Sequence, residues 1–117
     1  MLVTSFLSRN ALATTHRALS TLSFTPPNIA VVLSGCGVYD GSEITEATAV
    51  LVHVSRFQST FQCFAPDKEA MHAVDHTTGD EHPNTRNVLQ ESGRITRGDV
   101  KPLNQLNVED YDAVIFP

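Results

Sequence analysis

Cysteine is scarce in this chain, whose 117 residues include only Cys36 and Cys63. Two cysteines cannot form a disulfide framework, and in a reducing compartment both are expected to remain thiols. Long apolar runs are missing as well. The apolar pair Phe6-Leu7 is too short and too interrupted for a secretory signal core or a membrane span. We therefore expect no segment that crosses a membrane.

Acidic side chains are absent before Asp40, so all 13 Asp and Glu residues lie in 40–117. Six of the eight Lys and Arg residues lie in the same range, which gives it a net charge of −7 against +2 for the residues before it. A segment with this net negative charge repels the phosphate backbone of nucleic acids. We therefore expect no nucleic-acid partner.

Residues 1–25 combine many Ser, Thr, Leu and Ala residues with Arg9 and Arg17. This acid-free, basic composition is typical of a mitochondrial transit peptide. The sequence therefore predicts a mitochondrial matrix protein that is cleaved ahead of Pro26-Pro27. A tail without regular structure is the alternative interpretation of this segment.

The folded part is predicted to begin with a strand, a glycine loop and a helix. The run 28–33 is apolar without alternation, which favours a strand buried on both faces of a parallel sheet. Gly35, Gly37 and Gly41 follow it, and a helix is expected over 42–56. Ligands of open α/β sheets bind at the carboxyl ends of the strands. Gly35, Cys36, Gly37 and Tyr39 are therefore candidate pocket-loop residues, although Tyr39 could instead pack under the loop.

The helix over 42–56 is expected to be capped by Ser42 or Asp40. An apolar stripe along it is formed by Ile44, Ala47, Leu51 and Val54. Further along the chain the patterns predict a strand at 60–65, a helix at 84–97 and a strand at 111–117, with no assignment for 68–83 and a loop at 99–110.

Strands that alternate with helices predict an α/β fold with a doubly wound parallel sheet. Only three of its strands are predicted here, whereas sheets of this kind usually have five or more. The chain is therefore expected to be a truncated, N-terminal part of a larger domain.

The stretch from Val32 to Glu46, VLSGCGVYDGSEITE, resembles the ElbB-like branch of the class I glutamine-amidotransferase-like superfamily, which includes the PfpI-type proteins. The resemblance continues in one order to the end of the chain, through Phe64-Ala65-Pro66-Asp67, Met71-His72, Asp75-His76, Arg86-Asn87-Val88-Leu89, Ile95-Thr96-Arg97-Gly98 and Ala113-Val114-Ile115-Phe116-Pro117. It implies a flavodoxin-like fold over 28–117 that is often dimeric. The mitochondrial members of this family, the ES-one-type proteins, also carry a transit peptide.

The resemblance also implies an activity. Bacterial members are associated with glyoxalase chemistry, in which glyoxal becomes glycolate at a cysteine on a strand-to-helix elbow, without a cofactor. That cysteine is expected beyond residue 117, and neither Cys36 nor Cys63 occupies the elbow. The residue that carries over is the glutamate of the first helix, Glu46, with Glu43 as the alternative. The fragment itself is therefore expected to be inactive, and the small aldehyde ligand and the homodimer belong to its full-length parent.

This sequence departs from the family pattern at two places. Thr45 stands where relatives usually have His, which leaves open a non-catalytic binding or structural protein on the same fold. Phe57-Gln58-Ser59 replaces the usual glycine-containing turn, so the end of the first helix is expected to be distorted.

Other groups of residues give weaker indications of function. The spacing of the glycines differs from that of the dinucleotide fingerprint, and Asp40 would place negative charge beside a bound pyrophosphate, so a nucleotide-binding domain is a less favoured alternative. His72, His76 and His82 with Asp75 are expected to be loop side chains, so no metal site is predicted. Arg86 is expected to form a surface ion pair with Glu81 or Glu91.

Overall fold

The computed structural model describes residues 25–117, so the predicted transit peptide lies outside the described residues apart from Thr25. In chain order the elements are β1 (Asn28–Val32), α1 (Ile44–Arg56), β2 (Thr60–Ala65), β3 (Ala73–Val74), β4 (Glu81–His82), α2 (Val88–Thr96), β5 (Val100–Pro102), the 3₁₀ turns η1 (Leu103–Gln105) and η2 (Val108–Asp110), and β6 (Ala113–Ile115). No helix in this range has the length and apolar character needed to cross a membrane.

The main sheet is parallel, with the strand order β5-β2-β1-β6. The chain therefore moves outward from β1 through β2 to β5 and then returns across the sheet to β6. The direction of winding reverses between β1 and β6, which makes that position the topological switch point of the sheet. The α/β, flavodoxin-like class predicted from the sequence is confirmed.

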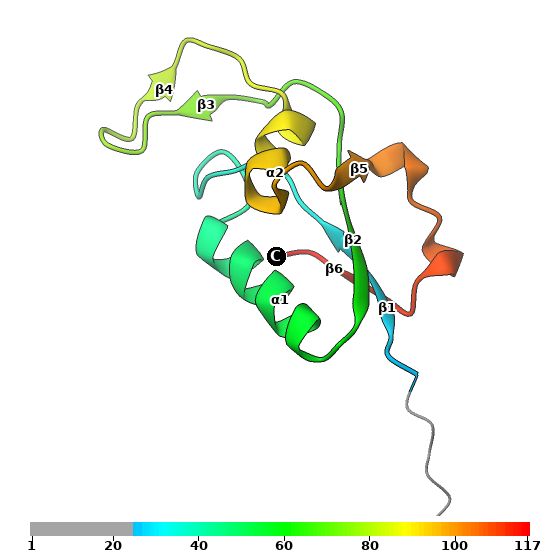
Figure 1. Cartoon of the computed structure of the whole chain (residues 1–117). Helices are drawn as coiled ribbons and strands as arrows, with labels where there is room; N and C mark the ends of the chain where they lie inside the picture. The colour runs from blue at the N-terminus through cyan, green and yellow to red at the C-terminus, as the bar shows by residue number, and fades with distance from the viewer. Residues whose placement is uncertain (1–24) are drawn as a thin grey trace, which may run out of the picture.

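The two faces of this sheet are covered by different kinds of segment (Figure 1). Both helices lie on one face, where the larger cluster of buried side chains includes Val31, Leu33 and Val54. The returning segment 103–111 covers the other face and packs Leu103, Leu106 and Tyr111 against a cluster that contains Phe64. The rings of Phe64 and Tyr111 meet edge to face, with centroids 5.8 Å apart. β1 is thus buried from both sides, as its unbroken apolar sequence predicted.

Helix α1 begins after Glu43, one residue later than a Ser42 cap and three residues later than an Asp40 cap would give. Glu43 is the N-cap, and its carboxylate accepts a hydrogen bond from the Glu46 amide at 2.7 Å, so the prediction of Ser42 or Asp40 was wrong. Both of those side chains are engaged elsewhere, with the Ser34 and Val74 amides. The apolar stripe packs on the sheet through Ala47, Leu51 and Val54, whereas Ile44, in the first turn, is exposed.

The end of α1 shows how the missing glycine is accommodated. Gln58 takes the left-handed conformation that glycine usually adopts after a helix, with φ of 57°. Its amide donates to the Ser55 carbonyl at 3.0 Å, and the Phe57 amide donates to the His53 carbonyl at 3.1 Å. The helix therefore closes regularly, with a residue of restricted conformation at the left-handed position.

The sequence patterns missed two parts of the fold. The segment left unassigned, 68–83, forms the small antiparallel pair β3–β4, which extends away from the main sheet (Figure 1). The segment expected to be a loop contains β5, so the described sheet has four strands where three were predicted. Strands of two or three residues have too few positions for a periodic pattern, and Pro102 within β5 is tolerated because β5 is an edge strand.

Candidate functional site

The loop 33–43, which joins β1 to α1, is closed by its own hydrogen bonds. The Ser34 amide donates to Ser42 Oγ at 3.0 Å, and the Ser42 amide donates to the Ser34 carbonyl at 3.2 Å. The Gly37 amide donates to the Ser42 carbonyl at 3.0 Å. The two ends of the loop are thus joined to each other, and Ser42 is buried between them.

Two glycines in this loop are closely packed, Gly41 against backbone atoms and Gly37 against a side chain. A Cβ built on Gly41 would lie 2.6 Å from the Cys36 nitrogen and 2.9 Å from the Ser34 oxygen, both backbone atoms. A Cβ on Gly37 would come 2.0 Å from Asp40 Oδ1. Gly35 is required for conformation instead, because its φ is +89°. The glycine pattern therefore encodes a tight turn.

Helix α2 is joined to this loop through one buried hydroxyl, that of Ser92. The Gly35 amide donates to Ser92 Oγ at 2.9 Å, and Ser92 Oγ donates to the Val88 carbonyl at 2.8 Å. Ser92 is fully buried. Sequence patterns did not reveal this contact, since a single serine within a helix gives no signal of a partner 57 positions away.

The β3–β4 segment holds the loop from the other side. Asp40 Oδ2 accepts from the Val74 amide at 2.7 Å. The Nε2 atom of His76 lies 3.1 Å from the Val38 amide, and its ring stacks on that of Tyr39 with centroids 5.1 Å apart. His76 was expected to be a loop side chain, and it lies between β3 and β4, but its contact with the glycine loop was not predicted.

The two glutamates of α1 differ in their surroundings. Glu43 serves as the helix cap, and the hydrogen bonds it accepts, chiefly from the Glu46 amide, lower the pKa of its carboxyl. Glu46 is exposed, and its carboxylate has no hydrogen bond or ion pair with the residues that the structure describes. The residues that the structure describes therefore leave the Glu46 carboxylate exposed.

Both thiols lie in environments that disfavour the thiolate. Burial raises the pKa of the half-buried Cys36, with a further contribution from the Glu91 carboxylate. Burial in the sheet raises the pKa of Cys63 to about 11. Cysteine reacts as the thiolate, so neither side chain is an activated nucleophile here.

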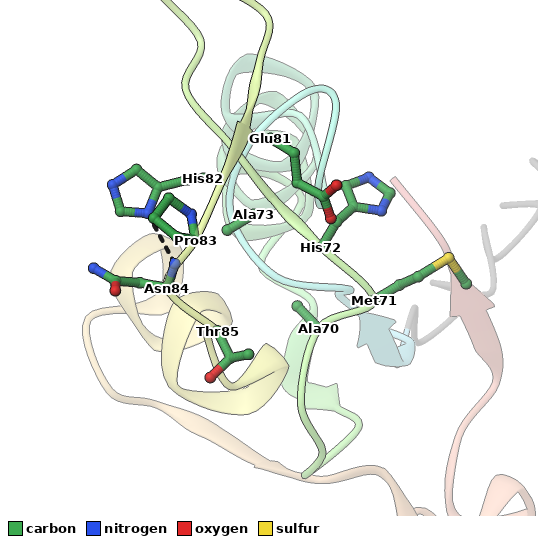
Figure 2. Close-up of a pocket in the computed structure, with 9 residues that line it drawn as sticks. All are labelled: Ala70, Met71, His72, Ala73, Glu81, His82, Pro83, Asn84 and Thr85. Atoms are coloured by element: carbon green, nitrogen blue, oxygen red, sulfur yellow. Dashed lines mark hydrogen bonds between the residues drawn. The ribbon is translucent and has the colours of Figure 1, made fainter.

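Two cavities open near the carboxyl ends of the strands. One of about 240 Å³ lies between the ends of β1 and β2 and is lined by Ser34, Tyr39, Lys68 and His72, among others. Tyr39 thus lines a cavity as well as packing against the loop. The other, of about 290 Å³, lies within the β3–β4 segment, where Glu81 and His72 face it from one side and His82 and Asn84 from the other (Figure 2). The lining residues of these two cavities do not include Glu46.

The remaining polar predictions concern Arg86 and the histidines. Arg86 pairs with Glu91 at 3.6 Å, and Arg94 pairs with the same carboxylate at 3.0 Å, so one of the two predicted ion pairs is present. In residues 25–117 no three His, Cys, Asp or Glu side chains are grouped so that they could hold a metal ion.

The chain is similar to several proteins of known family. The rat "ES1 protein homolog, mitochondrial" is 54% identical over 90 residues, which are 76% of this chain and 34% of that protein. The human "Glutamine amidotransferase-like class 1 domain-containing protein 3, mitochondrial" is 49% identical over 114 residues, covering 95% and 42% of the two chains. The zebrafish "ES1 protein, mitochondrial" is 42% identical over 95 residues, covering 77% and 35%.

A solved structure agrees with these relatives. The isoprenoid biosynthesis protein with amidotransferase-like domain from Ehrlichia chaffeensis superposes with a TM-score of 0.76 at 44% identity, over 78% of this chain and 43% of that one. No protein-family model matches the chain. The chain spans between a third and a half of the length of these relatives. On this fold and over the part of their length that it spans, the chain is similar to ES1-type and class I glutamine amidotransferase-like proteins, and the named animal relatives are mitochondrial.

Proposed function

We propose that this chain forms the first-strand side of a pocket for glyoxalase-type aldehyde chemistry in mitochondria, with Glu46 as its proton-transferring carboxyl. The observation that carries this proposal is the position of Glu46. It lies in the first turn of α1, directly after the glycine loop that leaves the carboxyl end of β1. β1 borders the switch point of the sheet, and ligands of open α/β sheets bind at such points.

The proposed reaction needs no external oxidant. Glyoxal takes up one water, one aldehyde carbon is oxidised to the carboxylate, and the other is reduced to the alcohol of glycolate. A thiolate adds to one aldehyde carbon, and a nearby carboxyl moves a proton between the two carbon centres. Water then releases the acid. Within this scheme the chain supplies only the carboxyl side.

Glu46 is a better candidate than Glu43 for this role. The Glu43 carboxylate caps the helix, and these hydrogen bonds lower its pKa, so it holds its proton poorly. A proton-transferring group works best with a pKa near the ambient pH. The Glu46 carboxylate has no such partner in the described residues and remains available to an incoming substrate.

The isolated chain is expected to be inactive. The raised pKa values of Cys36 and Cys63 keep both thiols protonated at neutral pH, and neither lies on the elbow that the family resemblance implies. The reactive thiol of the proposed mechanism therefore belongs to the part of the longer relatives that this chain does not match.

A chimera tests the proposal directly. The 90 residues of the rat protein that match this chain are replaced by the corresponding residues of this chain, and glycolate formed from glyoxal is measured. We expect turnover by the rat protein and by the chimera. Glu46→Gln in the chimera is expected to lower kcat by about 10²-fold or more, whereas the matched control Glu43→Gln affects mainly the stability of α1.

Each outcome decides one part of the proposal. If the rat protein itself forms no glycolate, the aldehyde chemistry is wrong for this family. An active chimera that keeps its rate with Glu46→Gln would show that this carboxyl is not the proton-transferring group. Glycolate formed by the isolated chain would contradict its predicted inactivity.

A non-catalytic binding or structural protein on the same fold is the second candidate. Thr45, exposed in the first turn of α1, favours it, because the family resemblance implies His at this position. Stabilisation of the chimera by a small aldehyde without turnover would support this candidate over the first.

Nucleotide binding through the glycine loop is opposed by the loop's own hydrogen bonds. Phosphate sites of this kind use free backbone amides. Here the amides of Gly35, Gly37 and Val38 donate to Ser92, Ser42 and His76, respectively. A calorimetric titration with a dinucleotide is expected to show no heat.

A further inference from the structure

Two segments far apart in the sequence exchange hydrogen bonds at the tip of the glycine loop. Asp40, in the loop, accepts from the backbone of the β3–β4 segment, at the Val74 amide. His76, in the β3–β4 segment, accepts from the backbone of the loop, at the Val38 amide. Each side chain thus binds the other segment's main chain. We call this pair of side chains the loop clamp.

The partners of His76 determine its tautomer. Its Nε2 atom lies 3.1 Å from the Val38 amide nitrogen and 3.5 Å from the Tyr39 amide nitrogen. Both of these groups can only donate, so Nε2 must carry a lone pair. The ring proton is therefore on Nδ1, which donates to the Val74 carbonyl at 3.0 Å. The imidazole in this arrangement is neutral.

Asp40 contributes an unused acceptor next to this ring. Its side chain is only 3% exposed, and its Oδ1 atom is buried without a hydrogen-bond partner among the residues that the structure describes. The nearest nitrogen that could carry a positive charge is His76 Nε2, at 3.6 Å. A buried carboxylate oxygen without a donor is costly. In the neutral tautomer, however, His76 has no proton to offer it.

A second proton on His76 would change these partners. This proton must bind at Nε2, where the amide hydrogens of Val38 and Tyr39 already point. The new N–H group would then face two other hydrogen-bond donors. The imidazolium would instead attract the free oxygen of Asp40, because a charge-assisted hydrogen bond is about twice as strong as a neutral one. Histidine is the side chain that ordinarily gains a proton as the pH falls from about 8 to about 5.

We propose that Asp40 and His76 are positioning residues that form a proton-dependent clamp, in which protonation moves His76 Nε2 from the loop amides to the Asp40 carboxylate and frees the loop tip. The Asp40–Val74 bond uses the other carboxylate oxygen, so it persists. The clamp therefore has two states. In one the loop tip is held by His76, and in the other the two side chains bind each other.

The other groups around His76 are consistent with this exchange. The Tyr39 ring stacks on it from the loop. From its own segment, the neighbouring Asp75 carboxylate is occupied by the Thr77 amide and hydroxyl at 2.8 and 2.7 Å. Two other imidazoles lie nearby and would oppose a second positive charge if they were charged: His72, whose Nε2 lies 3.4 Å from the Tyr39 carbonyl, and His82, which acts on the neighbouring Asp75 carboxyl. Asp40 therefore remains the acceptor that a charged His76 can reach.

The freed segment is the one that borders the cavity between β1 and β2. Tyr39 lines this cavity and also carries one of the amides that His76 binds. Release of the tip would change the cavity wall without unfolding the loop, because its base is held by Ser42 and Ser92. This inference rests on the loop geometry alone and does not depend on the proposed aldehyde chemistry.

Nuclear magnetic resonance on the full 117-residue chain tests the clamp. The ring nitrogens of His76 and the amides of Val38 and Val74 are followed from about pH 8 to about pH 5, the range in which imidazole titrates. We expect the Nδ1–H tautomer at the alkaline end. On acidification the Val38 amide resonance moves with the same midpoint as the His76 ring, while the Val74 amide resonance stays close to its starting position.

Three variants separate the clamp from a merely structural contact. His76→Gln is expected to abolish the pH response of the Val38 amide, and Asp40→Asn is expected to reduce the size of that response, because the charged acceptor for the protonated ring is gone. The control, His72→Gln, leaves the response in place. An Nε2–H tautomer at the alkaline end would overturn the proposal. A Val38 response that survives His76→Gln would overturn it as well. If a variant fails to fold, the tautomer and the Val38 response of the wild-type chain still test the proposal.

Discussion

Two connections leave the carboxyl edge of the sheet at neighbouring strands, and they are held in place by different means. The loop 33–43 after β1 is closed by its own backbone, and a Cβ at Gly41 would meet main-chain atoms at 2.6 Å. The connection 66–87 after β2 is about twice as long. A Cβ at Gly79, in its turn, would meet no atom within 4 Å.

The difference shows where each segment can tolerate change. The first loop shares the loop clamp with the second connection, but it is closed by hydrogen bonds within its own backbone and by one to α2, so its shape depends on atoms that cannot move independently. The second is attached mainly at its two ends and through the loop clamp, where a few side chains carry the contacts. Backbone packing should therefore dominate the stability of the first connection, and side-chain bonds that of the second.

Gly41→Ala should have the largest effect. The added methyl group meets three backbone atoms at 2.6–2.9 Å, and none of them is the end of a flexible side chain. We expect a loss of about 3 kcal/mol in the free energy of unfolding, measured by urea denaturation. A Gly41→Ala variant as stable as the wild type would contradict the tight closure of this loop.

Ser92→Ala should follow, because it leaves the buried Gly35 amide without an acceptor. The expected loss is about 1–3 kcal/mol, and hydrogen exchange at the Gly35 amide should become faster. The matched control is Gln90→Ala, at an exposed position of the same helix. Equal losses in the two variants would mean that the hydroxyl does not hold the loop.

Gly79→Ala tests the second connection. There is room for the methyl group, so only the positive φ of +83° opposes it. We expect a loss of about 1 kcal/mol in the free energy of unfolding, with no change in the amide resonances of the loop 33–43. Gly79→Asn should cost less, because asparagine tolerates this conformation better. A loss as large as that of Gly41→Ala would remove the contrast between the two connections.

The smallest effect is expected at the cap of α1. Hydrogen bonds lower the pKa of Glu43 below 4.5, so its stabilising contribution is present above about pH 4.5 and is lost as the pH falls through the lowered value. Exchange of the Glu46 amide should therefore become faster in acid. The Glu43→Gln variant should lack this pH dependence, and an unchanged profile in that variant would contradict the capping role.

Much of the fold followed from local patterns. The unbroken apolar run at β1, the stripe of α1 and the glycines between them place the site loop at a strand-to-helix turn, because these signals depend on neighbouring residues only. The identity of the cap of α1 did not follow, since Ser42 and Asp40 are suitable cap residues that have other partners in space.

The candidate site was predicted less completely than the fold. Glu46 comes from a family resemblance and the pocket-loop residues from the strand-to-helix pattern, and their roles stay predictions. The sequence did not predict that Ser92 and His76 contact the loop, although both hydrogen-bond to its backbone. Their importance comes from single contacts to residues 57 and 38 positions away, and no periodic pattern encodes such contacts.

Local residue chemistry thus sufficed to place the strands, the helices and the turn that needs glycine, because strand and helix periodicity and backbone sterics act over a few residues. The tertiary structure decided which polar groups meet at the loop and left one carboxylate oxygen of Asp40 facing a neutral imidazole. That arrangement arises only when the sheet and its connections pack together, since it depends on distances between segments that the chain order does not set.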